Sequence, residues 1–149
     1  MSFSFGITTS KEFFELLMLE VDEYLNDELN IRKAMMCSMI SYHLTDWLNW
    51  EINHDKKKLG KFRKNLNCPE LSIMHDIING TKHLTLDGGR GKAVADTELH
   101  VGAFSRQFSS AFDKSSLDII LKDGTKIGFE ETIISVTDFW RNYFENYHP

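Results

Sequence analysis

The sequence contains little cysteine and little proline. Its 149 residues include only 2 cysteines and 2 prolines. Two cysteines are too few for the disulfide framework of a small secreted scaffold, and the flanks of Cys37 and Cys68 are typical of helices. Because proline interrupts helices, its scarcity leaves long stretches free to form them. The sequence therefore indicates a helical protein with reduced thiols inside a cell.

Long hydrophobic runs are also missing. No uncharged stretch approaches the roughly 18 residues that a membrane helix needs. The first residues, MSFSFGITTSKEFF, lack the basic region and the apolar segment of a secretory signal. We therefore expect neither membrane insertion nor secretion, and we expect a cytoplasmic location.

Positive charge is not in excess either. The chain has 17 Lys plus Arg against 22 Asp plus Glu, a formal net charge of -5. The chain as a whole therefore lacks the excess positive charge that is typical of domains that bind duplex nucleic acid. What the sequence does contain is 42% hydrophobic residues, including 11 Phe, which is typical of a folded globule. We expect residues 1–149 to form one domain.

Cap signals and apolar periodicity predict the helices. Thr9 and Glu12 form a T-x-x-E capping box, in which each side chain bonds a backbone donor at the start of a helix. Asn30 precedes the next apolar pattern and is a suitable N-cap. Pro69 follows Cys68 at a position where a helix tolerates proline. The three predicted helices span about residues 10–28, 31–55 and 69–82.

The second half of the chain adds a β-hairpin. Two alternating apolar runs surround Asp123-Gly124, a pair that favours tight hairpin turns, so we predict a hairpin near 116–130. An amphipathic helix follows over 131–147. Glycines between 88 and 91 predict a mobile loop near 85–97, and 99–112 fits a strand or a helix equally well. The predicted fold is α+β and mostly α, a bundle of about four helices with a hairpin before the C-terminal helix.

A histidine and aromatic face is predicted on the helix over 31–55. At 100° per residue, one arc of this helix contains His43, Trp47, Trp50 and His54, together with Met36, Ile40 and Leu44. We therefore expect His43 to point toward the core, with Asp46 one turn away at the edge of the arc. The first interpretation is a buried histidine with a satisfied hydrogen bond. The alternative is a polar centre of His43, Asp46, Asn79 and His83, if the helix over 69–82 faces this one.

The helix over 69–82 separates polar and apolar side chains. His75, Asp76, Asn79 and His83 lie opposite Leu71, Met74, Ile77 and Ile78, which predicts a solvent face. In a third functional interpretation, a subset of His43, Asp46, His75, Asp76 and His83 binds a divalent metal in a helical-bundle hydrolase. Because the sequence has no H-E-x-x-H and no cysteine-rich pattern, we expect neither a metal nor a cofactor.

The segment RNYFENYH near the C-terminus resembles the R-x4-6-H motif of HEPN domains, small helical bundles of bacterial toxin and anti-phage systems. The resemblance implies metal-independent RNA cleavage, with Arg141 stabilising phosphate and His148 acting as acid or base. It also implies a homodimer that brings two copies of the final helix together.

A basic connector joins the second and third predicted helices. We interpret this connector first as a solvated surface segment. The alternative is that it contacts RNA, through its positive charge and through stacking of bases on Phe62. Its basic residues are Lys56, Lys57, Lys58, Lys61, Arg63 and Lys64.

A second resemblance covers more of the chain. The stretches SYHLTDWLNW, DIINGTKHL and VTDFWRNYF, the last after the hairpin, resemble a layout of bacterial and phage proteins with no assigned activity. The resemblance implies a prokaryotic or viral origin and an association with mobile elements.

Negative charge combined with many aromatic residues suits binding to a basic protein surface. We therefore expect a regulatory or inhibitory protein that acts by protein–protein interaction, with the HEPN-like ribonuclease as the alternative.

Overall fold

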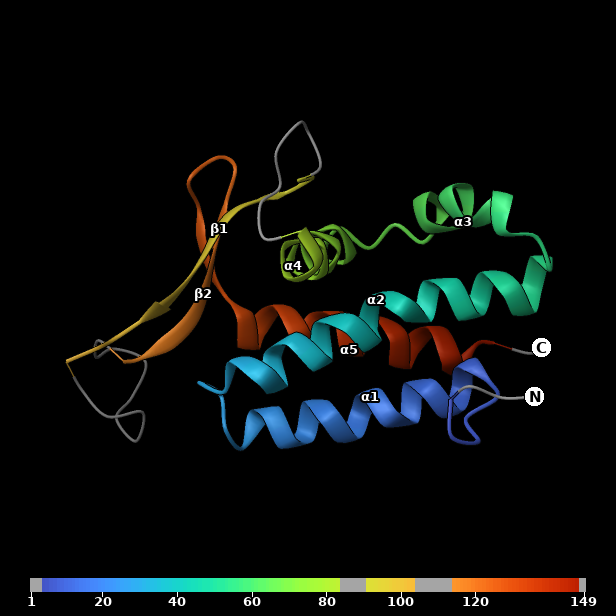
Figure 1. The fold of residues 1–149 in the computed structure, drawn as a ribbon, viewed down its shortest axis with the longest axis horizontal. Helices are drawn as coiled ribbons and strands as arrows, with labels where there is room; N and C mark the ends of the chain where they lie inside the picture. Colours follow the sequence, from blue (N-terminus) through green and yellow to red (C-terminus); the bar gives the residue numbers. More distant parts are fainter. Residues whose placement is uncertain (1–3, 84–90, 104–113, 148–149) are drawn as a thin grey trace.

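The computed structural model describes residues 4–83, 91–103 and 114–147, and these form an α+β fold that is mostly helical (Figure 1). The helices are α1 (Ser10–Leu25), α2 (Ile31–Asn53), the 3₁₀ helix η1 (Lys56–Lys58), α3 (Leu59–Asn65), α4 (Glu70–His83) and α5 (Phe129–Glu145). The strands are β1 (Val94–His100), β2 (Ser116–Leu121) and β3 (Lys126–Gly128). The predicted fold class is confirmed, including the hairpin before the last helix.

Helices α1, α2 and α5 lie side by side, while α4 crosses α2 and is seen nearly end-on (Figure 1). The antiparallel sheet has the order β1-β2-β3 and contacts α4 and the start of α5. Among the described helices, none combines the length and the apolar character that crossing a bilayer requires. The sheet therefore stands at one side of the helical bundle, and the two layers meet at α4 and α5.

The predicted starts of α1 and α2 are confirmed, whereas α5 begins at Phe129, two residues before the predicted start. Thr9 accepts a hydrogen bond from the Glu12 backbone N–H, and the Glu12 carboxylate accepts one from the Thr9 N–H, so both halves of the capping box form. Asn30 caps α2 by accepting from the backbone N–H of Lys33. Both caps use side chains within three residues of the groups that they satisfy, which is why the sequence alone reveals them.

The prediction that His43 points toward the core is wrong. Its side chain is 51% exposed, and Trp50 on the same predicted arc is 51% exposed as well. Trp47 is half-buried and stacks on Phe13 of α1, with 4.7 Å between the ring centroids. The aromatic arc of α2 is therefore a rim of the bundle rather than its centre.

The face of α2 that packs into the bundle consists largely of small and hydroxyl side chains. Their hydroxyls bond carbonyls of the same helix: Ser38 donates to Ala34, Ser41 to Ser38 and Thr45 to Tyr42. Because these groups are satisfied locally, they enter the core without an unpaired polar atom. The buried residues are Ala34, Cys37, Ser38, Ile40, Ser41, Tyr42, Leu44, Thr45, Leu48 and Asn49.

Two predictions change, one for the loop before β1 and one for the connector. Strand β1 begins at Val94, so the predicted loop over 85–97 was too long at its C-terminal end, and residues 84–90 lie outside the described residues. The segment 56–65, expected as a connector broken at Gly60, forms η1 and α3.

The hairpin turn lies where the sequence predicts it. Gly124 has φ 87°, and the Asp123 carboxylate accepts a hydrogen bond from the Thr125 backbone N–H. Strand β1 pairs with β2, so the hairpin of β2 and β3 becomes part of a three-stranded sheet.

Candidate functional site

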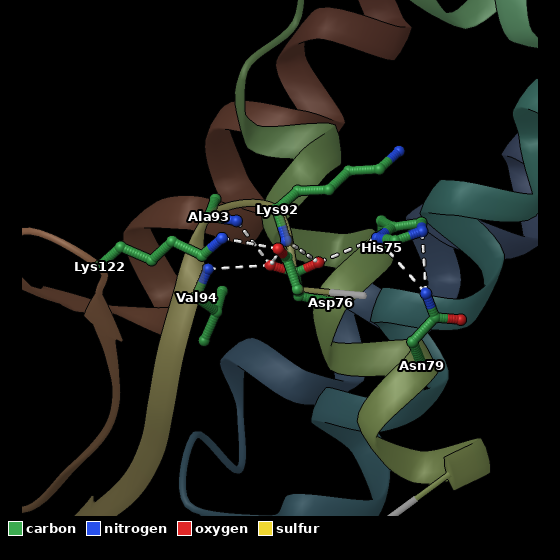
Figure 2. A network of polar contacts seen from close by, with 8 residues as sticks. His75, Asp76, Asn79, Lys92, Ala93, Val94 and Lys122 are labelled. Atoms are coloured by element: carbon green, nitrogen blue, oxygen red, sulfur yellow. Dashed lines mark hydrogen bonds and ion pairs between the residues drawn. The ribbon is translucent and has the colours of Figure 1, made fainter. Parts of the chain in front are cut away.

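The side chain of Asp76 lies at the centre of a polar network between α4 and the start of β1 (Figure 2). It is fully buried, and it accepts hydrogen bonds from the backbone N–H groups of Lys92, Ala93 and Val94 at 2.7 to 2.9 Å. Three successive N–H groups that converge in this way form a concavity suited to an anion. Here the anion is the chain's own carboxylate, so Asp76 holds β1 onto α4.

The same hydrogen bonds decide the charge of Asp76. Burial by itself raises the pKa of a carboxyl group, because it disfavours the charged form. The hydrogen bonds from Ala93, Val94, His75 and Lys92 outweigh the effect of burial, so the pKa of Asp76 lies below its ordinary value of 3.8. Asp76 is therefore a carboxylate at neutral pH.

His75 continues the network toward the surface of α4. Its Nδ1 lies 2.9 Å from Oδ1 of Asp76, and its Nε2 lies 2.8 Å from Nδ2 of Asn79. In the tautomer that suits both contacts, Nδ1–H donates to the carboxylate and Nε2 accepts from the amide. The imidazole also meets the Tyr42 ring edge-on, with 5.4 Å between centroids. Both ring nitrogens of His75 are thus engaged within the chain.

Arg63 of α3 links this region to the exposed face of α2. Its guanidinium carbon lies 4.4 Å from the centroid of the Tyr42 ring. Its Nε donates to the Thr45 hydroxyl, and its terminal nitrogen lies 2.8 Å from the Asp46 carboxylate. Asp46 in turn lies 3.9 Å from Nδ1 of His43. Arg63 therefore anchors α3 on α2 and joins the His43–Asp46 pair to the Tyr42–His75 contact.

Two of the four predicted polar-centre residues form a direct pair. His43 and Asp46 meet each other, whereas Asn79 contacts His75, and His83 is exposed at the end of α4. Burial opposes ionisation of Asp46, but His43 and the Arg63 cation outweigh it, so the pKa of Asp46 lies below 3.8. Arg63 was assigned from sequence only to the basic connector, and nothing in the sequence places it against Asp46.

The prediction of a solvent face on α4 is wrong for Asp76 and incomplete for its neighbours. Asp76 is fully buried, while His75 and Asn79 are half-buried. The apolar periodicity of α4 could not reveal this, because the partners of Asp76 lie at positions 92–94. A buried carboxylate requires such partners, since leaving it unpaired is costly.

The metal interpretation finds no ligand set in the part of the chain that the structure describes. No group of three or more His, Cys, Asp or Glu side chains is placed there to hold a metal ion. His43–Asp46 and His75–Asp76 are separate pairs.

The two cysteine thiols are not activated as nucleophiles. Burial is the largest cause of the shift that raises the pKa of Cys37 and the pKa of Cys68 to about 12.

The residues of the HEPN-like motif fall at the end of α5. Arg141 is exposed and pairs with Asp138, one turn earlier in the same helix. His148 lies outside the described residues. The arginine is thus held by a neighbour in its own helix, and its predicted role with His148 stays a prediction.

An apolar groove opens between the start of α2 and the sheet, and we call it the α2–sheet groove. Its volume is about 190 Å³. Three of its apolar side chains are well exposed, with Ile31 at 53%, Met35 at 37% and Leu99 at 49%. Six of its lining residues are Ile31, Ala34 and Met35 of α2 and Leu99, Leu117 and Ile119 of the strands. The periodicity of the separate elements gave no sign of it, because it exists only where they meet.

Comparison of this chain with protein-family models, with curated proteins and with solved structures finds no match.

Proposed function

We propose that this chain is a small intracellular protein of bacterial or phage origin that acts by binding another protein at the α2–sheet groove. One observation carries the proposal: an open apolar groove of about 190 Å³ is edged by Ile31, Met35 and Leu99, each at least 37% exposed. Clustered exposed apolar side chains on a folded protein mark interaction sites, because water contact with them is unfavourable. Regulation or inhibition of the partner is the role that we assign to this binding.

The polar network supports the same proposal. Asp76 accepts three backbone hydrogen bonds and one from His75, and His75 also contacts Asn79. A catalytic histidine needs a ring nitrogen that can reach a substrate. Here both nitrogens contact side chains of the same helix, α4, and the Asp76 carboxylate holds β1. The network therefore serves the fold that shapes the groove.

Site-specific photo-crosslinking tests the proposal. A photoreactive amino acid replaces Ile31 at the groove, and in the control it replaces Leu19, which is exposed on α1. We expect a specific protein adduct from position 31 in cells that make the chain, and none from position 19. Adding Leu99→Glu, which places a charge across the groove, should remove the adduct.

The result that contradicts the proposal is equally concrete. If the two positions give the same adducts, or if Leu99→Glu leaves the adduct from position 31 unchanged, the groove is not the binding site. Circular dichroism and thermal unfolding of each variant establish that the fold is intact before adducts are compared.

A second candidate function, RNA binding, is favoured by the basic segment η1–α3. Its five lysines are all exposed, and no acidic residue interrupts positions 56–65. Clustered cations attract phosphates, and the attraction weakens as salt rises. If the segment binds RNA, Lys57→Ala with Lys61→Ala should weaken binding of a single-stranded RNA and flatten its salt dependence, whereas Lys11→Ala on α1 should not.

The ribonuclease alternative has its own test. Arg141→Ala should abolish metal-independent cleavage of RNA if Arg141 stabilises the reacting phosphate, and Arg32→Ala on α2 is the matched control. Cleavage that survives Arg141→Ala unchanged counts against the HEPN-like interpretation.

A further inference from the structure

The size of the α2–sheet groove suits one large apolar side chain. Its volume is about 190 Å³, and an apolar cavity of roughly 150 Å³ is enough to bind benzene. Met35 at the rim is flexible and polarisable, so it can adapt to a ring or to a branched chain. The groove therefore accommodates a single aromatic or branched aliphatic anchor rather than a whole helix face.

The charged residues that line the groove are both acidic. They are Glu98 of β1 and Asp118 of β2. Lys126 of β3 lies 2.5 Å from Glu98, and its pKa is raised first by the hydrogen bond to Glu98 and also by the charge of Asp118. Asp118 is only 9% exposed and accepts from the Ser116 hydroxyl at 2.8 Å. One lysine thus faces two carboxylates, which leaves negative charge in excess at this wall.

We infer that the partner presents a bulky apolar side chain, such as phenylalanine or leucine, flanked in its sequence by lysine or arginine. This inference rests on the proposed function of the groove and names the chemistry of its partner. The apolar anchor fills the groove, while the flanking cation meets the excess negative charge at Glu98 and Asp118. The net charge of -5 favours the same kind of partner at longer range.

The experiment uses three synthetic peptides that differ in one feature each. The first has a central phenylalanine with a lysine on either side, the second replaces both lysines by glutamate, and the third replaces the phenylalanine by alanine. Each is titrated into the full-length protein, and the methyl resonances of Met35 and Leu99 are followed by NMR. We expect the lysine-flanked phenylalanine peptide to bind about fivefold more tightly than the glutamate-flanked one, the upper range for an exposed ion pair.

Two matched variants assign the charge preference. Glu98→Gln keeps the size of the side chain and removes its charge, so the preference for lysine flanks should fall. Glu145→Gln removes an exposed carboxylate of α5 that does not line the groove, so the preference should stay. Both changes are at partly or fully exposed positions, and the unchanged NMR spectrum of the core verifies the fold.

The remaining outcomes separate the inference from the proposed function. Equal binding of the lysine-flanked and glutamate-flanked peptides overturns the charge requirement. Binding of the alanine peptide as tight as that of the phenylalanine peptide overturns the apolar anchor. In both cases a groove-specific crosslink at position 31 still supports the proposed function. Contacts between the Met35 methyl and aromatic protons of the same chain before any peptide is added also overturn the inference, because the groove is then filled from within. Failure of the crosslink together with silent groove methyls contradicts the proposed function itself.

Discussion

The carboxylate of Asp76 on α4 accepts a hydrogen bond of 2.9 Å from the backbone N–H of Val94, the first residue of β1. Two further N–H groups, those of Lys92 and Ala93, bond to the same carboxylate. These bonds fix where the sheet begins relative to the helices. The α2–sheet groove depends on that placement, because β1 supplies Leu99 and Glu98 to its wall.

Asp76→Asn should therefore destabilise the protein strongly. The amide keeps one acceptor but turns an N–H₂ group toward backbone donors, so we expect a loss of roughly 2–3 kcal/mol in the free energy of unfolding. Asp138→Asn is the control, because its exposed pairing with Arg141 contributes less than about 1 kcal/mol. Urea unfolding measures both. A loss for Asp76→Asn no larger than the loss for the control contradicts the anchoring role.

The contribution of Asp76 should also depend on pH. Its pKa is below the ordinary 3.8 in the folded state, so the folded state favours the charged form. The stabilisation is fully present above the unfolded pKa and is lost as pH falls through the lower, folded pKa. The stability difference between the wild type and Asp76→Asn should shrink as the solution is acidified below about pH 4. Urea unfolding across an acid pH series tests this, and a constant difference would contradict it.

The buried face of α2 can be checked with two substitutions. Leu48 is fully buried and Trp50 is half-exposed, although Trp50 is the larger residue. Leu48→Ala should lower the free energy of unfolding by about 2–5 kcal/mol, because it leaves a cavity. Trp50→Ala should cost less than about 1 kcal/mol. The opposite order in thermal or urea unfolding would restore the aromatic arc as the core face.

The end of α5 is tied to the start of α1 through Glu51 of α2. Glu51 accepts from the Ser10 backbone N–H at 2.6 Å, from the Ser10 hydroxyl at 2.5 Å and from the Tyr147 hydroxyl at 3.1 Å. Tyr147→Phe removes the last of these bonds, so we expect a loss of about 1 kcal/mol in the free energy of unfolding.

Alkaline pH should remove the same contribution. Burial, followed by the hydrogen bond to Glu51, raises the pKa of Tyr147 from 10.0 to about 12. A raised folded pKa stabilises the protein fully below the unfolded pKa, and this stabilisation is lost as pH rises through the folded value. The difference between the wild type and Tyr147→Phe should therefore shrink between pH 10 and 12. Urea unfolding with tyrosinate absorbance follows both changes, and a widening difference would contradict the assignment.

Local features of the chain were predictable from sequence. The capping box at Thr9 and Glu12, the Asn30 cap and the turn at Gly124 all depend on groups within a few residues of one another. The positions of the long helices and of the hairpin follow from the same short-range rules, so the sequence is enough to predict the α+β class. The predicted loop extended too far, to residue 97, because strand β1 is specified by its pairing with β2. The paired residues are distant in sequence: Val94 and Leu121 are 27 residues apart, and Glu98 and Asp118 are 20 apart.

The candidate site was only partly predictable. Sequence periodicity places His43 and Trp50 on one side of α2, but it cannot tell which side meets the other helices when serines and threonines satisfy their hydroxyls within the helix. It also assigns Asp76 to a polar face, because the N–H groups that pair with it come from positions 92–94. The basic residues of η1–α3 are visible in sequence, whereas the contact of Arg63 with Tyr42 and Asp46 is not.

By itself the sequence determined the four long helices, the caps at Thr9 and Asn30, the hairpin and the charge balance, because each of these depends on neighbouring residues or on composition. Only the tertiary structure decided which face of α2 is buried, why Asp76 is held as a carboxylate, and that Ile31, Met35 and Leu99 edge one groove. The physical reason is that burial and pairing depend on groups brought together from distant parts of the chain. The α2–sheet groove joins positions 31–38 to positions 97–99 and 117–119, and no local pattern records that meeting.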